Sequence, residues 1–182
     1  MVQNLMPIEL CKSLIRENSL PEKKWSKHSW FSYDQPASPQ KAEKELDIIY
    51  ATTEQFKMVE TYLQEALRKY QAKYSQEEGQ TGSSWIRHIS TIRFNRYKVG
   101  TQMQTHHDHI HTIFDGKYKG VPILSFIGLL NDNYQGGEFL CRKKEIKLTR
   151  GNIVLFPSNF MYPHRIKEIT KGIRHSFVGW AF

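Results

Sequence analysis

Apolar residues recur at helical spacing near the start of the chain. They follow Pro7 three and four residues apart: Ile8, Cys11, Leu14 and Ile15. This spacing predicts a short amphipathic helix over residues 7–18. Pro7 suits its first turn, where the backbone N–H that proline lacks is not needed.

A second and longer apolar stripe follows after Thr52. Its members are Phe56, Val59, Leu63, Ala66, Leu67 and Tyr70. They predict a helix from Thr53 to Tyr74 that packs one face on a sheet, and Thr52 with Gln55 makes a capping-box start. The flanking segments predict loops: residues 19–45 are rich in proline and aromatic residues, with a short strand expected near Trp30, and residues 75–84 are polar.

The periodicity changes after Trp85, where short apolar or alternating runs are separated by turn residues. Such runs predict strands. They cover residues 86–97, 101–112, 122–130, 138–142, 145–148, 153–156, 162–166 and 173–182. Short strands in this number after a helical start favour a double-sheet jelly roll over an up-and-down barrel. The predicted fold is therefore mainly β (α+β), with a jelly-roll (double-stranded β-helix) core and the N-terminal helices packed on one sheet.

Length and composition are those of one folded domain. The 182 residues are 39% apolar and 24% charged, which excludes the low-hydropathy, high-charge composition of a disordered chain. We expect a single domain over residues 1–182, in which residues 1–84 give helical and loop support and residues 85–182 form the jelly-roll core.

Several sequence features indicate a cytoplasmic protein. No apolar run reaches the roughly eighteen residues of a membrane span, and charges interrupt any signal-peptide core, so no membrane partner is expected. Cys11 and Cys141 are too few for a disulfide framework. Both are expected to be packing residues in a reducing compartment.

Positive charge is concentrated in the second half. Residues 85–182 hold 15 Lys+Arg against 6 Asp+Glu, whereas residues 1–84 hold 11 against 12. A basic surface can steer nucleic acid, serve a small dianionic cosubstrate or simply aid solubility. Charge alone does not choose among these.

The segment from Gln104 to Thr112 reads QTHHDHIHT and concentrates histidine around one carboxylate. In a strand, His106, Asp108 and residue 110 share one face, and the neighbouring histidines at 107, 109 and 111 share the other. Only the first face offers a carboxylate. A non-haem Fe(II) centre uses two imidazoles and one carboxylate on one face, with positions left open. A third ligand is therefore required.

His164 is the best third ligand. It begins a predicted strand late in the chain, where a jelly roll can bring a late strand beside an early one. The remaining candidates are His28, His88 and His175.

Arg174 follows His164 by ten residues, in KGIRHSFVGW. Alternation along this predicted strand places Arg174, Ser176, Val178 and Trp180 on one face. An arginine that faces a barrel interior needs an anion, and a guanidinium group matches a carboxylate with two parallel hydrogen bonds. A dicarboxylate cosubstrate would supply that anion.

These motifs resemble the prolyl 4-hydroxylase-like 2-oxoglutarate/Fe(II) dioxygenases over roughly residues 90–182. The family's approach to the metal, Tyr-x-x-Gly then His-x-Asp, corresponds to Tyr97, Gly100, His106 and Asp108. Its later elements correspond to LLN at 129–131, GGE at 136–138, Gly151 to Phe156, His164, Gly172, Arg174 and Trp180. An isolated His-x-Asp is weak, but five elements in order are specific.

The resemblance implies the cofactors Fe(II), 2-oxoglutarate and O2, with ascorbate supporting activity. His106, Asp108 and His164 would bind the metal, and Arg174 would bind the far carboxylate of 2-oxoglutarate. The chain departs from the family at Met103 and Leu129, where the family often has tyrosine. Because the second change removes a common hydroxyl partner of that carboxylate, Tyr97, Ser125 or Ser176 would have to assist Arg174.

The resemblance also implies a reaction: hydroxylation of a substrate C–H bond with release of succinate and CO2. The leading substrate is a prolyl residue in a protein or peptide. A free amino acid or other small molecule is an alternative, and so is an alkylated nucleic-acid base. Base demethylases place an arginine about six residues after the distal histidine, where this chain has Thr170, which disfavours nucleic acid as a partner. A non-enzymatic jelly-roll binding module is the remaining hypothesis.

Overall fold

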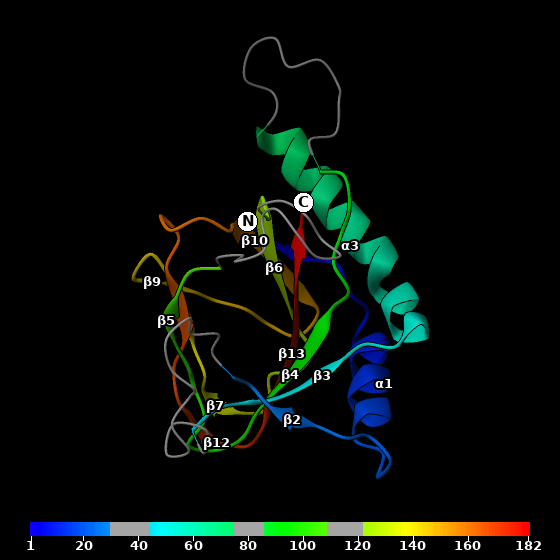
Figure 1. Cartoon of the computed structure of the whole chain (residues 1–182), viewed down its shortest axis with the longest axis vertical. Coiled ribbons are helices and arrows are strands. Elements are labelled where there is room, and N and C mark those ends of the chain that lie inside the picture. The colour runs from blue at the N-terminus through cyan, green and yellow to red at the C-terminus, as the bar shows by residue number, and fades with distance from the viewer. Residues whose placement is uncertain (30–43, 75–85, 109–121) are drawn as a thin grey trace.

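Two antiparallel sheets pack against each other face to face, and two helices cover the outer face of the larger sheet (Figure 1). The structure is a computed structural model that describes residues 1–29, 44–74, 86–108 and 122–182. The view in Figure 1 shows the order of the layers, with the helices α1 and α3 on the right, the large sheet in the middle and the small sheet on the left.

The large sheet has seven strands in the order β1-β10-β6-β13-β4-β3-β2. Their bounds are Val2–Asn4 (β1), Asn152–Pro157 (β10), Leu124–Leu129 (β6), Arg174–Ala181 (β13), Arg93–Tyr97 (β4), Asp47–Tyr50 (β3) and Ser26–Lys27 (β2). The small sheet has the order β5-β11-β8-β9, with bounds Met103–His106 (β5), His164–Ile166 (β11), Phe139–Cys141 (β8) and Lys144–Ile146 (β9). A two-stranded sheet pairs β12 (Ile169–Lys171) with β7 (Gln135–Gly136). Except for β2-β3 and β3-β4, neighbouring strands of the large sheet are not consecutive in the chain, as in a jelly roll.

The helices form where the apolar stripes predict them. Helix α1 spans Ile8–Asn18, directly after Pro7, and helix α3 spans Thr53–Tyr74. The capping box is present, because the amide of Gln55 donates to Thr52 Oγ1 and the amide of Thr52 donates to Gln55 Oε1, both at 3.2 Å. These two bonds satisfy backbone donors that the first turn would otherwise leave free.

Two apolar clusters hold the layers together. The first lies between the helices and the large sheet and includes Leu14, Leu63, Phe94, Phe126 and Phe177, each at most 1% exposed. The second lies between the two sheets and is built from Tyr97, Met103, Ile127, Phe139, Val154, Phe156, Ile166, Ile169 and Val178, with Leu46. Because side chains alternate along a strand, one face of β4, β6 and β13 serves each cluster.

The sequence pattern missed several strands. The N-terminal half is not confined to helices and loops, since β1, β2 and β3 join the large sheet. These strands have two to four residues, too few to show a period. The pattern also missed β7 and β12, and β4 begins at Arg93 rather than Ile86. The expected strand near Trp30, the loop at 75–84 and residues 109–112 lie outside the described residues.

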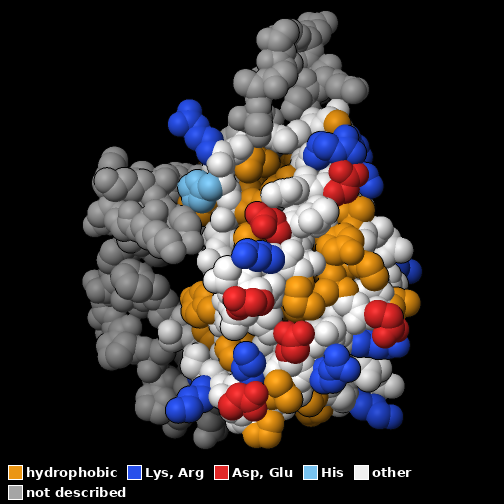
Figure 2. Space-filling view, turned by 90° about the vertical axis from the view of Figure 1, so that its right-hand side faces the viewer, with side chains coloured by type: hydrophobic (Ala, Val, Ile, Leu, Met, Phe, Trp, Pro, Cys, Tyr) orange, Lys and Arg blue, Asp and Glu red, His pale blue; other side chains and the backbone are white. Residues whose placement is uncertain are grey.

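Charges of both signs are interspersed on the helical side of the molecule. Figure 2 shows this face, with Lys and Arg side chains set among Asp and Glu side chains and apolar ones. No helix within the described ranges is both long and apolar enough to cross a bilayer.

Candidate metal and cosubstrate site

Three side chains of the types that can bind a metal meet between the sheets. His106 ends β5 and His164 begins β11, and the two residues are direct cross-strand partners. Asp108 follows β5 by two residues, on the side where His106 points. One ligand atom from each residue lies within 4.8 Å of the others. Strand pairing thus joins residues that are 58 positions apart in sequence.

Backbone contacts fix the orientation of both imidazoles. Nδ1 of His106 lies 2.8 Å from the carbonyl of Gln104, and Nδ1 of His164 lies 3.1 Å from the carbonyl of Tyr162. Each Nδ1 therefore carries the proton and donates it to a carbonyl, so that each Nε2 presents a lone pair. The two Nε2 atoms lie 3.7 and 3.8 Å from the oxygens of Asp108, too far for hydrogen bonds.

The surroundings keep the His106 imidazole neutral. Burial and the neighbouring His164 together lower the pKa of His106 to about 4, against the opposing effect of Asp108. The rings of Phe139 and Phe156 pack around His164, with ring centres 6.0 and 4.7 Å away. A neutral imidazole is the form that binds a metal.

Asp108 accepts a hydrogen bond from one hydroxyl group of the large sheet. Ser125 on β6 donates a hydrogen bond to Asp108 Oδ2, and its oxygen lies 2.8 Å from the hydroxyl of Ser158. Ser125 was one of three residues, with Tyr97 and Ser176, expected to assist Arg174. Its hydrogen bonds are with Asp108 and Ser158, whereas Ser176 and Tyr97 contact Arg174. Ser125 lies four residues along β6 from Leu129, and Leu129 is the residue opposite Ser176, the partner of Arg174. Ser125 is therefore far along the strand from Ser176. Ser158 was not singled out from the sequence, because an isolated serine carries no signal.

Arg174 lies deep between the sheets and is 1% exposed. Its Nη1 donates to Ser176 Oγ at 2.8 Å, and its guanidinium carbon lies 5.1 Å from the ring centre of Tyr97. Its Nε is buried without a hydrogen-bond partner, and within the described ranges no carboxylate pairs with it. A buried cation without an acid is costly unless a ligand supplies the anion.

Gly137, Tyr97 and Leu129, which belong to the motifs of the sequence, surround the position of Arg174. Gly137 has φ +69, and a Cβ there would lie 3.1 Å from Arg174 Cδ and 2.4 Å from Ile169 Cδ1. The glycine thus leaves room for the arginine stem. Burial raises the pKa of Tyr97, against the opposing effect of Arg174, so its phenol stays neutral. Leu129 is fully buried opposite Ser176 and offers no hydroxyl, as expected.

The other histidine candidates have different positions. Nδ1 of His28 lies 3.1 Å from Glu45 Oε2, and His88 stacks on Phe182 with ring centres 4.7 Å apart. Burial lowers the pKa of His175 to about 4, and this residue is the cross-strand partner of Arg96. None of the three belongs to the metal-ligand group found within the described residues. Residues 109 and 111 lie outside those residues.

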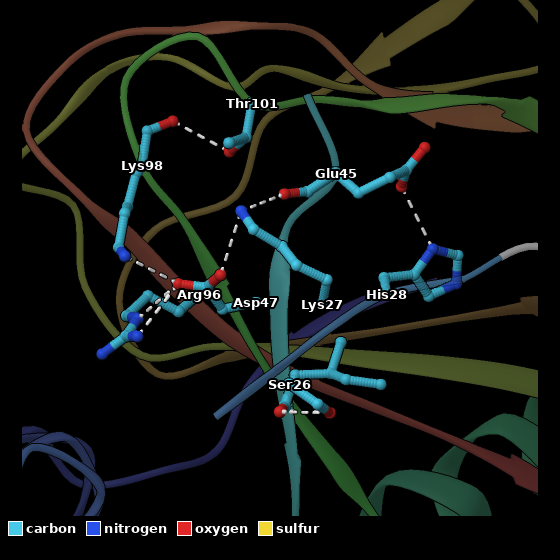
Figure 3. A network of polar contacts seen from close by, with 9 residues as sticks. Ser26, Lys27, His28, Glu45, Asp47, Arg96, Lys98 and Thr101 are labelled. Atoms are coloured by element: carbon cyan, nitrogen blue, oxygen red, sulfur yellow. Dashed lines mark hydrogen bonds and ion pairs between the residues drawn. The ribbon is translucent and has the colours of Figure 1, made fainter. Parts of the chain in front are cut away.

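A paired charge network lies at the edge of the large sheet (Figure 3). Asp47, whose side chain is 8% exposed, forms ion pairs with Arg96 at 2.9 Å, Lys98 at 3.0 Å and Lys27 at 3.1 Å. Burial alone would raise the pKa of Asp47, but these pairs outweigh it and hold the pKa below its ordinary value. The network connects β2, β3 and β4, because Lys27, Asp47 and Arg96 lie on these successive strands.

Comparison with known proteins agrees with this site. Residues 92–182, half of the chain, match the 2OG-Fe(II) oxygenase superfamily. The chain belongs to this family. It is 34% identical over 101 residues to a PKHD-type hydroxylase of Crocosphaera subtropica, and the aligned part covers 52% of this chain and 44% of the relative. The chain thus spans about half the length of the curated relative that it matches.

Solved structures of 2OG-Fe(II) oxygenases share the fold along the whole chain. A viral collagen prolyl hydroxylase from Paramecium Bursaria Chlorella virus-1, solved with 2OG, has a TM-score of 0.67 at 13% identity and is covered over 93% of its length. A prolyl hydroxylase of Trichoplax adhaerens, solved with a peptide fragment of hypoxia inducible factor, has a TM-score of 0.65 at 17% identity and is covered over 82%. Both alignments cover 100% of this chain.

The described residues fit the two groups that the superfamily name implies. Two imidazole nitrogens and a carboxylate oxygen within 4.8 Å of one another are the donor set of a non-haem Fe(II) centre. The unpartnered Nε of buried Arg174 fits a dicarboxylate such as 2-oxoglutarate, because a carboxylate would satisfy both the charge and the free donors.

Proposed function

We propose that this protein is a 2-oxoglutarate- and Fe(II)-dependent dioxygenase that hydroxylates a C–H bond, with peptidyl proline as the leading substrate. The observation that carries the proposal is the pairing of the His106, Asp108 and His164 group with a buried arginine that has no acidic partner among the described residues. A binding module with structural histidines would not need such an arginine.

Each of these residues has a defined task in the proposed reaction. His106 and His164 offer Nε2, and Asp108 offers a carboxylate oxygen that Ser125 holds in place. When bound, Fe(II) and 2-oxoglutarate supply the oxidative chemistry, in which O2 and a substrate C–H are converted to a C–OH while 2-oxoglutarate becomes succinate and CO2.

Arg174 anchors the far carboxylate through its free donors, with Ser176 fixing Nη1 and Tyr97 supporting the guanidinium face. The apolar cluster around His164 excludes water, which strengthens each of these charge interactions. The protein therefore contributes ligand geometry, cosubstrate orientation and a dry site.

Proline as substrate is supported by the relatives. The names of the solved structures describe a collagen prolyl hydroxylase and a prolyl hydroxylase bound to a peptide. The PKHD-type relative is a hydroxylase as well. We therefore propose a proline-containing protein or peptide as partner, and ascorbate as the reductant that sustains activity.

The test combines metal binding with succinate release. Purified protein with Fe(II), ascorbate and 2-oxoglutarate is expected to form succinate slowly even without a prime substrate. His106→Ala and Asp108→Ala should lower both iron content and succinate release by roughly two orders of magnitude, since even outer partners of metal ligands are worth 10–100-fold.

His107→Ala is the matched control, because this neighbouring histidine is exposed and outside the metal-ligand group. It should keep both properties. Undiminished succinate release in the His106 and Asp108 variants would reject the proposed function.

A further inference from the structure

A second arginine faces the space between the sheets, at the metal end. Arg93 begins β4, where its direct partners are Tyr50 on β3 and Val178 on β13. Its guanidinium carbon lies 6.0 Å from the ring centre of Trp180, two residues beyond Val178 on the same face. Arg93 thus lies over the inner face of the large sheet, beside Trp180.

Strand register connects this position to the metal ligands. Trp180 is the direct cross-strand partner of Ser125, which donates to Asp108. Arg174 lies six residues from Trp180 along β13, which corresponds to roughly 20 Å of strand. The space between the sheets therefore has an arginine toward each end, Arg174 buried and Arg93 partly buried, with the candidate metal ligands beside the Arg93 end.

The charge of Arg93 lacks an acidic partner within the described part of the chain. Its Nε donates to Asn95 Oδ1 at 3.1 Å, and no ion pair or hydrogen bond engages its two terminal nitrogens there. Burial lowers the pKa of Arg93, and the weaker effects of Tyr97, Tyr50 and Asp108 oppose this. Partial burial thus costs this cation solvation, and no ion pair within residues 1–29, 44–74, 86–108 and 122–182 offsets that cost.

Trp180 contributes a further unused donor. Its indole Nε1 is buried and has no hydrogen-bond partner among the described residues. Buried donors in native proteins are nearly always paired, so an unpaired one beside a free guanidinium group indicates an acceptor that a ligand brings. Arg96, which points to the opposite face of the same strand, shows the contrasting case, because its Nε and Nη2 both donate to Asp47 Oδ2.

We propose that Arg93 and Trp180 form a subsite for a carboxylate of the prime substrate, placed next to the C–H bond that is hydroxylated. This inference rests on the proposed function and specifies its substrate class. The carboxylate can belong to an acidic side chain beside proline in a peptide or to the free amino acid itself. Both sources present the same planar anion to the guanidinium group.

The experiment uses matched substrates that differ in one charge. Hydroxylation is followed by mass spectrometry for the gain of one oxygen, on peptides in which Glu or Gln flanks proline on either side, and on L-proline against L-prolinamide. Wild-type protein should prefer the anionic member of at least one pair by about tenfold or more in kcat/KM, since charge-assisted hydrogen bonds are the strong ones. The pair that responds identifies the source of the carboxylate.

Variants separate the subsite from other effects. Arg93→Gln should bring the two members of the responding pair within about twofold of each other, and Arg93→Lys should retain part of the preference because it keeps the charge. Arg165→Gln is the control, since Arg165 is exposed and alternates away from His164 on β11. It removes the same charge and should keep the full preference.

Four outcomes would overturn the subsite while leaving the oxygenase proposal intact. One is an equal rate on both members of every pair, and another is a preference that survives Arg93→Gln. The third is a rise in the 2-oxoglutarate requirement of Arg93→Gln that equals its loss of kcat/KM for the anionic substrate, which would assign Arg93 to the cosubstrate. The fourth is succinate release without hydroxylation of any anionic substrate. Absence of succinate release from wild-type protein would reject both.

Discussion

Arg174 and Asp47 are both buried charges on the large sheet, but the protein treats them in opposite ways. Asp47 has three cationic partners within 3.1 Å. Arg174, at 1% exposure, has one serine hydroxyl, one aromatic ring and a free Nε. The described residues compensate the charge of Asp47, which joins strands, whereas they leave uncompensated the charge of Arg174, which we propose a ligand meets.

The same distinction separates the two faces of β4. Arg96 points to the network at the sheet edge and is paired, whereas Arg93 points between the sheets and has free terminal nitrogens within the described residues. Functional sites are places where a protein tolerates lower stability in exchange for binding. The four predictions below test whether Arg174 and Asp47 differ in this way.

The largest expected effect is on cosubstrate binding. Arg174→Met removes the guanidinium donors but keeps an unbranched apolar stem, so the requirement for 2-oxoglutarate should rise by about 100-fold, because hydrogen bonds to charged groups are worth about 1.5–3 kcal/mol each. Iron content should be retained. The measurement is succinate release against 2-oxoglutarate concentration, and an unchanged requirement would contradict the role of Arg174.

Next in size is the stability lost when the paired acid is removed. Asp47→Asn leaves three cations facing each other, and we expect a loss of about 2 kcal/mol in the free energy of unfolding, below the full cost of breaking a buried pair since the cations are partly exposed. Urea denaturation measures it. Glu9→Gln, which breaks an exposed pair with Lys12, is the control and should cost less than about 0.5 kcal/mol.

A smaller effect of opposite sign is expected from Arg174→Met on the ligand-free protein. Replacing an uncompensated buried cation with an apolar side chain of similar shape should raise the free energy of unfolding by about 1 kcal/mol. Thermal denaturation without iron or 2-oxoglutarate measures this. A large loss of stability instead would show that Arg174 is a structural residue like Asp47.

The smallest effect concerns pH. The pKa of Asp47 is lower in the folded than in the unfolded protein, so its contribution to stability is complete above the unfolded value near 4 and is lost as the pH falls through the folded value. The stability difference between wild type and Asp47→Asn should therefore shrink below about pH 4. A difference that stays constant across this range would mean that the ion pairs do not stabilise the fold.

The sequence contained much of the fold and of the candidate site because both use regular periods. Helical spacing identified α1 and α3, and alternation along one strand separated His106 and Asp108 from His107. The ten-residue separation between His164 and Arg174 predicted that both side chains face the interior, and the structure buries both between the sheets. Short strands such as β2 carry too few residues for a period to show.

What the sequence by itself determined is which residue types lie on one face of each strand, because a strand has a period of two whatever its neighbours are. Only the tertiary structure decided which faces meet. It placed His164, and not His28, His88 or His175, opposite His106. It directed the hydroxyl of Ser125 to Asp108 and not to Arg174. It also decided which arginines have an acid nearby, because compensation of a charge depends on contacts between strands far apart in the chain.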